Sequence, residues 1–219
     1  MGLAAEMTGV ASDLATKSPE DRRAVFTRSG IIALIAFLTL IDLFGSQALL
    51  PVLVDRYGVS PGAMGFAVNA STIGMAGASL VVAIFARRID RRRGIWVCLA
   101  LLSLPTIGLA FTEDLATFTL LRIAQGVFMA AALTLTLTYL SEICTTTAIG
   151  GAMAAYITGN VASNLFGRLM ASELAGNLGL AESFLGFAAL NLLGALAAYL
   201  YFGGRSDTLP AGDGSSVLA

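Results

Sequence analysis

Six long apolar segments, separated by short polar connections, dominate this sequence. At a rise of 1.5 Å per residue, each would form a helix of roughly 27–39 Å, enough to cross a hydrocarbon core of about 30 Å. A membrane β-strand would alternate polar and apolar residues, and no segment does so for long. The sequence therefore predicts an all-α, polytopic membrane protein with six spanning helices. The predicted spans are about Ile31–Val54, Pro61–Phe85, Gly94–Phe111, Leu115–Leu140, Ile149–Leu174 and Leu180–Phe202.

Composition supports a membrane protein and excludes several other classes. The 219 residues are 57% hydrophobic and 12% charged, against roughly 25% charged residues in a soluble domain. The net charge of −1 gives no reason to expect a nucleic-acid partner. The chain has no histidine, and its two cysteines, Cys98 and Cys144, lie in different segments, so no metal site or cofactor is predicted. The sequence also lacks the HExxH, GxSxG and Walker-type motifs, so an enzyme is not expected.

Basic residues predict how the protein is oriented. Residues 1–29 are predicted to be a cytoplasmic tail, 30–203 the six-helix domain and 204–219 a disordered cytoplasmic tail. One side of the predicted membrane carries nearly all the cations, and the other side carries only Arg56 among acids. The positive-inside rule then places both termini and the loop of residues 86–94 in the cytoplasm. The predicted location of the protein is the inner (plasma) membrane. The cations on the cytoplasmic side are Lys17, Arg22, Arg23, Arg28, Arg87, Arg88, Arg91, Arg92, Arg93 and Arg205.

Three ionisable residues fall well inside predicted spans, namely Asp42, Arg122 and Arg168. Each costs at least about 2.5–3.5 kcal/mol at the centre of a bilayer. Such groups face a bundle interior or an aqueous cavity and pair there. A purely structural ion pair that fixes helix register is the alternative interpretation.

The depth of these residues suggests roles for them. Asp42 falls near the middle of its span, and because burial disfavours a charged carboxylate, we predict that it couples transport to protons. Arg122 and Arg168 fall in the outer halves of their spans. Two cations at similar depth repel each other unless water or anions separate them, so we expect both to line a cavity. The polar side chains predicted to line the same cavity are Gln47, Gln125, Asn160 and Asn164.

The stretch "YITGNVASNLFGRLMASE", residues 156–173, carries two patterns at a spacing of four. One is a series of small residues that would let another helix approach closely. The other places two carboxamides and Arg168 on one neighbouring face. The stretch therefore predicts a helix with a packing flank and a polar flank beside a cavity, although packing alone would explain the glycines. The small residues are Gly151, Ala155, Gly159, Ser163, Gly167 and Ala171, with a shorter series of Ala70, Gly74 and Ala78 in the second span.

Four short motifs occur in order along the spans. They are "DLFGSQALLP" in the first, "ARRIDRRRG" between the second and third, "RIAQG" in the fourth and "GNVASNLFGR" in the fifth. Together they resemble the major facilitator superfamily, specifically the N-terminal half of its drug:proton antiporter-like and arabinose-efflux-like members. The loop is similar to the family's G-x-x-x-D-R-x-G-R-R signature. Asp90 and Arg91 match it, whereas Ala86 and Arg93 replace its glycines.

The resemblance implies a fold and a set of contacts. Members of the family carry two six-helix halves, and this chain is expected to end after the first. Two parallel copies, or a separately encoded second half, would then complete the fold. Spans one, two, four and five would face the cavity and the second half, while spans three and six would face lipid. The loop of Asp90, Arg91, Arg92 and Arg93 would be a cytoplasmic gate that grips the opposite half.

The function that the resemblance implies is proton-coupled efflux of a small organic solute by a half-size secondary transporter. The family's functional arginine maps onto Arg122. Two other interpretations stay open at this stage. The chain could be a non-transporting accessory or assembly subunit of a membrane complex, or a truncated, inactive transporter fragment.

Overall fold

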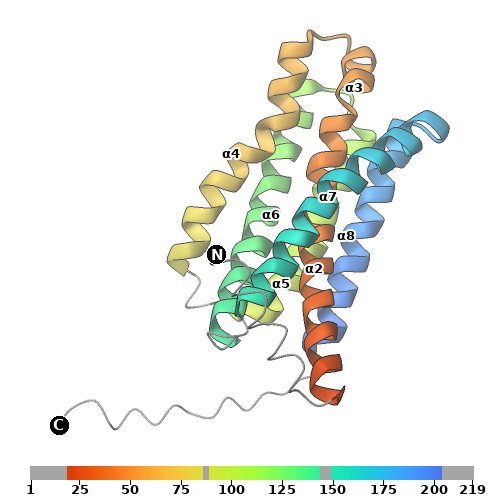
Figure 1. The fold of residues 1–219 in the computed structure, drawn as a ribbon. Coiled ribbons are helices and arrows are strands. Elements are labelled where there is room, and N and C mark those ends of the chain that lie inside the picture. Colours follow the sequence, from red (N-terminus) through yellow and green to blue (C-terminus); the bar gives the residue numbers. More distant parts are fainter. Residues whose placement is uncertain (1–18, 86–88, 144–148, 204–219) are drawn as a thin grey trace, which may run out of the picture.

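The structure, a computed structural model, describes residues 19–85, 89–143 and 149–203, and Figure 1 shows its fold. Within these residues all the regular elements are α-helices. Lys17, Arg87, Arg88, Cys144 and Arg205 lie outside the described residues, as do both predicted tails apart from residues 19–29. The helices are α2 (Pro19–Ala48), α3 (Leu50–Tyr57), α4 (Pro61–Phe85), α5 (Arg91–Phe111), α6 (Leu115–Ile143), α7 (Ile149–Asn177) and α8 (Leu180–Gly203).

The first predicted span is interrupted near its end, which the sequence analysis did not expect. α2 stops at Ala48 and α3 begins at Leu50. Pro51 lies in the first turn of α3 and has no N–H to donate to the carbonyl four residues earlier, so one helical hydrogen bond is lost. Backbone bonds from Leu49 to Gly45 and from Leu53 to Leu49, at 3.1 and 2.9 Å, keep the two pieces nearly continuous.

The other predicted spans match the helices closely at most of their ends. α4 covers Pro61–Phe85 as predicted, and α5 to α8 extend each of the remaining predicted spans by up to a few residues at one end. α2 begins at Pro19, inside the stretch predicted to be a tail. The helices alternate in direction, so the start of α2, the start of α5 and the end of α8 all lie at the lower end of the bundle in Figure 1.

Close packing between α2 and α7 uses small residues. A Cβ added to Gly159 would run into the backbone of Ala33, and one added to Gly167 would lie 2.7 Å from the carbonyl oxygen of Ile41. Both glycines are buried, as are Ser163 and Ala171. These four members of the predicted small-residue series therefore form the flank of α7 that packs on α2. Gly151 is exposed, with nothing near its α-carbon, and does not take part.

α4 and α6 approach each other in the same way. Gly74 of α4 meets the backbone at Ile123, and Gly126 of α6 meets the backbone at Ser71. Because each helix contributes a glycine at the crossing, the two backbones touch where any side chain would hold them apart. This contact brings the side chains next to Gly126 against α4, where the first of two polar sites lies.

Five helices in the described part of the chain are long and apolar enough to cross a membrane. The five stretches are Ser29–Ala48, Pro61–Val82, Arg91–Phe111, Leu115–Glu142 and Leu180–Phe202. α7 is not among them, although it has 29 residues. Asn160, Asn164, Arg168 and Glu173 lower its hydropathy. The surroundings of α7 in the assembled protein therefore decide whether this helix lies in lipid.

Candidate functional site

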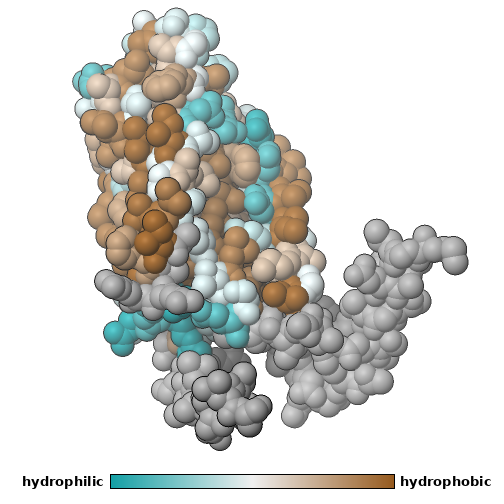
Figure 2. Space-filling view, turned by 90° about the vertical axis from the view of Figure 1, so that its left-hand side faces the viewer, coloured by the Kyte–Doolittle hydropathy of each residue, from teal (hydrophilic) through white to brown (hydrophobic). Residues whose placement is uncertain are grey.

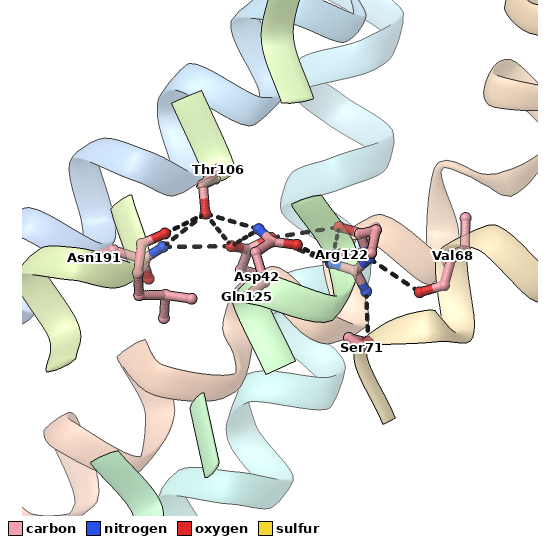
Figure 3. Close-up of polar contacts among 9 residues, drawn as sticks. Asp42, Val68, Ser71, Thr106, Arg122, Gln125 and Asn191 are labelled. Carbon is pink, nitrogen blue, oxygen red and sulfur yellow. Dashed lines mark hydrogen bonds and ion pairs between the residues drawn. The ribbon is translucent and has the colours of Figure 1, made fainter. Parts of the chain in front are cut away.

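Asp42 lies at the centre of a hydrogen-bond network inside the bundle, shown in Figure 3. Its Oδ2 accepts hydrogen bonds from Thr106 Oγ1 and Gln125 Nε2, each at 2.7 Å, and a longer one from Asn191 Nδ2 at 3.3 Å. Its Oδ1 accepts from Ser46 Oγ at 3.4 Å. The carboxylate therefore accepts from side chains on α2, α5, α6 and α8, which are far apart in the sequence.

Arg122 supplies the positive charge of the same network. Its Nε donates to the carbonyl oxygen of Val68 at 3.0 Å and its NH2 donates to Ser71 Oγ at 3.1 Å, so it ties α6 to α4. Its NH1 donates to Gln125 Oε1 at 2.6 Å and lies 3.9 Å from Asp42 Oδ1. The guanidinium is thus held on one side by α4 and on the other by the carboxylate of α2.

Two side chains bridge Arg122 and Asp42, whose charged groups are 3.9 Å apart. Gln125 accepts from Arg122 and donates to Asp42, and Ser46 accepts from Arg122 at 3.1 Å while donating to Asp42. Both charged side chains are 0% exposed. Burying two charges is costly unless further hydrogen bonds satisfy them, and here almost every polar atom has a partner. We call this set the buried cluster; its members are Asp42, Ser46, Ser71, Thr106, Arg122, Gln125 and Asn191, with the backbone of Val68.

The structure differs here from the expectation that Arg122, Gln125 and Arg168 line one cavity. Arg122 and Gln125 are fully buried, whereas Arg168 is exposed on α7. The physical reason is the close crossing of α4 and α6, which turns this face of α6 inward onto α2 and α4. Arg122 is thus paired with a buried carboxylate, whereas the acceptors of Arg168 are neutral carboxamides. The alternative interpretation of a structural ion pair fits the geometry of Asp42 and Arg122.

A second polar group lies on the surface. Arg168 donates from Nε to Asn164 Oδ1 at 2.9 Å and from NH2 to Gln47 Oε1 at 3.3 Å. Gln47 Nε2 in turn donates to Asn69 Oδ1 at 3.3 Å. The bonds run from α7 across α2 to α4. We call this set, together with Asn160, the open face.

The open face borders a pocket of about 520 Å³. Hydrophilic side chains gather in the upper half of the surface shown in Figure 2, beside apolar ones. The hydrogen bonds and the pocket bring the predicted residues Gln47, Asn160, Asn164 and Arg168 together on one side of the molecule, with Asn69 as a member that the sequence analysis did not name. The pocket is lined by Phe44, Ile157, Asn160, Val161, Asn164, Leu165, Arg168 and Leu169.

The two flanks predicted for α7 are confirmed. Gly159, Ser163 and Gly167 are buried against α2, while Asn160, Asn164 and Arg168, each one residue further on, line the pocket. Side chains one residue apart on a helix point about 100° away from each other. A single helix thus combines a packing surface with a polar surface.

The described part of the basic loop makes its contacts within the chain. Asp90 caps α5 by accepting from the backbone N–H groups of Arg92 and Arg93 at 3.0 and 3.3 Å. Arg91 pairs with Glu142 of α6 at 2.7 Å. Asp90 and Arg91 both have these partners within the chain, and their predicted contact with a second half stays a prediction. The helix start created by Asp90 places the next arginine beside α6.

Sequence reasoning missed four members of the buried cluster, Ser46, Ser71, Thr106 and Asn191. Two of them come from α5 and α8, the helices that the resemblance assigns to lipid. Asn191 offered a usable signal, since it is a carboxamide in the middle of an otherwise apolar span. The hydroxyl groups offered none, because serine and threonine in a membrane helix can bond the carbonyl four residues earlier, as Thr106 also does with Leu102.

Comparisons with known proteins agree with this architecture. A family model described as Major Facilitator Superfamily matches residues 32–216. The chain is 27% identical over 138 residues to an uncharacterized MFS-type transporter, YybF, of Bacillus subtilis. It is 26% identical over 139 residues to an uncharacterized transporter, BU588, of Buchnera aphidicola. These matches cover 63% and 64% of this chain but 34% of each relative, so the chain spans about a third of the length of the curated relatives it matches.

Proposed function

This chain belongs to the major facilitator superfamily, and we propose that it forms a six-helix half of a secondary transporter that exports a small organic solute against an inward flow of protons. Its relatives are named as transporters, and its apolar helices make it a multi-pass membrane protein. In the proposal, six helices, α2 to α8 with α2 and α3 counted as one span, work against a second six-helix body. That body is a further segment of the same polypeptide, a second copy of this chain or a separate partner half.

The open face is the observation that carries the proposal. Arg168 is exposed on α7 among apolar neighbours such as Leu165 and Leu169. An arginine turned toward lipid costs at least about 2.5–3.5 kcal/mol at the centre of a bilayer and less toward its surface. A second body placed over α7 and α4 would remove that cost by enclosing the pocket as a wet cavity between two bundles. The solute would then bind on the open face.

The buried cluster supplies the proposed coupling site. Proton binding at Asp42 would remove the negative charge that faces Arg122 and would replace an acceptor with a donor in a network of at least four donors. The sealed arrangement would then be less favourable, and α2 could move relative to α4 and α6. Alternating access requires such a bistable contact between helices.

The orientation in the membrane is part of the proposal. Arg91, Arg92 and Arg93 lie at the end of the bundle where α2 starts and α8 ends. The positive-inside rule assigns that end to the cytoplasm. Both termini would then be cytoplasmic, in the inner (plasma) membrane, and two copies could stand side by side in parallel.

Proton coupling is tested with the full chain in proteoliposomes under an imposed pH gradient. Ethidium and 4-phenylbutyrate serve as a cationic and an anionic probe. The wild type should move at least one probe at a rate that depends on the gradient, and Asp42→Asn should remove that dependence. Asp55→Asn, a change of an exposed acid on α3, is the matched control and should leave it intact. A gradient dependence that survives in Asp42→Asn would exclude Asp42 from the mechanism.

The second body is tested separately by native mass spectrometry from mild detergent. The proposal expects a dimer or a complex with a partner half. A monodisperse monomer that still moves a probe in liposomes would refute this part of the proposal.

If Asp42→Asn is poorly folded, the double variant Asp42→Asn/Arg122→Gln, which removes both charges, provides the proton-coupling test instead.

The complete burial of Asp42 and Arg122 favours a second candidate function. A non-transporting accessory subunit would use Asp42 and Arg122 purely to fix helix register, and sealed, fully paired charges suit that role. On this view neither probe moves, Asp42→Asn/Arg122→Gln retains assembly, and the chain copurifies with a membrane complex.

A further inference from the structure

The two arginines inside the predicted spans differ in how their charges are balanced. Arg122 has Asp42 beside it in the buried cluster. Arg168 makes no ion pair with any acidic side chain in the described part of the chain, and its two hydrogen bonds go to carboxamide oxygens. Carboxamides hold a guanidinium in place without neutralising it. Arg168 is therefore a positioned cation with its charge uncompensated.

The bonds that hold Arg168 leave one of its nitrogens available. Nε and NH2 are used by Asn164 and Gln47, and NH1 has no partner among the described residues. The acceptors are held in turn, since Gln47 donates to Asn69 and Asn69 donates to the carbonyl oxygen of Gly65 at 2.9 Å. A guanidinium fixed in this way offers a charged donor to a ligand at little cost in side-chain entropy.

The pocket beside Arg168 is mostly apolar. Ile157, Val161 and Leu165 extend along α7 from Arg168, and Phe44 of α2 also lines the pocket. Asn160 lines the far part of the same pocket, and its side chain makes no hydrogen bond within the described residues. It lies eight positions before Arg168, which corresponds to about 12 Å along the helix.

We propose that this pocket binds an amphipathic organic monoanion, with the carboxylate of the ligand on Arg168 and its apolar body along Ile157, Val161 and Leu165. A guanidinium binds a carboxylate through charge-assisted hydrogen bonds that a neutral amide cannot match. Asn160 is placed to bond a neutral polar group at the other end of such a molecule. As a statement about the exported solute this rests on the proposed function, whereas as a statement about binding it can be tested without transport.

The test compares matched ligand pairs on the full chain in lipid nanodiscs. The pairs are 4-phenylbutyrate with 4-phenylbutyramide and decanoate with decanamide, and empty nanodiscs correct for partition into lipid. Isothermal titration should show at least tenfold tighter binding of one carboxylate than of its amide. Arg168→Gln should bring the ratio close to one, and Arg168→Lys should retain most of the preference.

Arg56→Gln is the matched control, because it makes the same substitution at an exposed arginine of α3 that does not line this pocket. It should leave the carboxylate-to-amide ratio unchanged. A ratio near one for both pairs in the wild type, or an unchanged ratio in Arg168→Gln, would overturn the proposal. If an acidic side chain of a second copy already pairs with Arg168, the ratio would be near one for both ligand pairs in the wild type.

The outcomes separate this inference from the proposed function. Carboxylate preference without movement of either probe in liposomes would leave the anion site standing and refute transport. Gradient-driven movement of ethidium without any carboxylate preference would support transport and refute the anion site.

Discussion

Arg122 on α6 and Arg168 on α7 occupy two regions that solve the problem of a cation in a membrane protein in opposite ways. In the buried cluster the guanidinium is 0% exposed, close to a carboxylate and bonded on every side. On the open face it is exposed and held only by neutral oxygens. In the buried cluster the charge of Arg122 helps to hold the helices together. On the open face the charge of Arg168 remains available to a ligand.

The difference shows that the acceptors around a cation, more than its depth in the membrane, decide whether it stabilises helix packing or can bind a ligand. A buried ion pair adds little net stability when both partners are present, but losing one partner leaves an uncompensated charge. An exposed cation with neutral acceptors can be lost with little effect on folding and a large effect on ligand binding. Single substitutions in the two regions should therefore have opposite consequences.

The largest effect is expected for breaking the buried pair. Arg122→Leu should lower the free energy of unfolding by about 3–5 kcal/mol, because Asp42 is left charged and unpaired inside the bundle. The double variant Asp42→Leu/Arg122→Leu should recover a large part of that loss. Steric-trap unfolding in bicelles measures both.

Arg168→Leu provides the comparison and should change the free energy of unfolding by no more than about 0.5 kcal/mol, as for an exposed side chain away from packing contacts. Equal costs for Arg122→Leu and Arg168→Leu would mean that the two regions are not physically distinct.

Adjacent residues on α7 offer a second comparison. Gly159→Val should destabilise the protein by about 1–3 kcal/mol or more, since the added side chain would push α7 away from the backbone of Ala33. Asn160→Val, one position further on and facing the pocket, should stay within about 0.5 kcal/mol. The same unfolding assay measures both, and a cost at Asn160 similar to that at Gly159 would place the packing flank of α7 elsewhere.

Within the buried cluster the contributions should also differ. Gln125→Leu removes the side chain that bonds both charges and should cost about 1.5–3 kcal/mol, as is typical of hydrogen bonds to charged groups. Asn191→Leu should cost less, about 0.5–1.5 kcal/mol, because its bond to Asp42 is 3.3 Å long and its Oδ1 has no hydrogen-bond partner among the described residues. The reverse order would show that Asn191 supports the carboxylate more than its distance indicates.

The smallest effect concerns an exposed carboxylate between α5 and α6. Asp114 caps α6 by accepting from the backbone N–H and the hydroxyl of Thr117 at 2.8 and 3.0 Å, and these bonds lower the pKa of Asp114 below its ordinary value. A lowered pKa in the folded state means that the contribution of the cap is complete above the unfolded-state pKa and disappears as the pH falls through the folded value.

The amide chemical shift of Thr117 should follow this titration, with a midpoint below that of an unperturbed aspartate, and Asp114→Asn should abolish it. A midpoint at or above the ordinary value would contradict the cap.

Much of the fold was predictable because it depends on local sequence. The length of each apolar segment gave five of the helices nearly to their ends, and the four-residue spacing of Gly159, Ser163 and Gly167 gave the packing flank of α7. The same spacing gave the polar flank, so Asn164 and Arg168 were correctly placed together. The break at Leu49 was missed, although Pro51 marks the place where a helical hydrogen bond must be absent.

What the sequence determined by itself was which residues are helical, how far along each helix the charges lie and which side chains share a helix face. Only the tertiary structure decided that Arg122 closes onto Asp42 while Arg168 stays open. The bonds that hold Asp42 in the buried cluster join residues 64, 83 and 149 positions apart. Periodicity fixes the angle between side chains on one helix, but the rotation of each helix toward its neighbours depends on where backbones touch, as α4 and α6 do at Gly74 and Gly126.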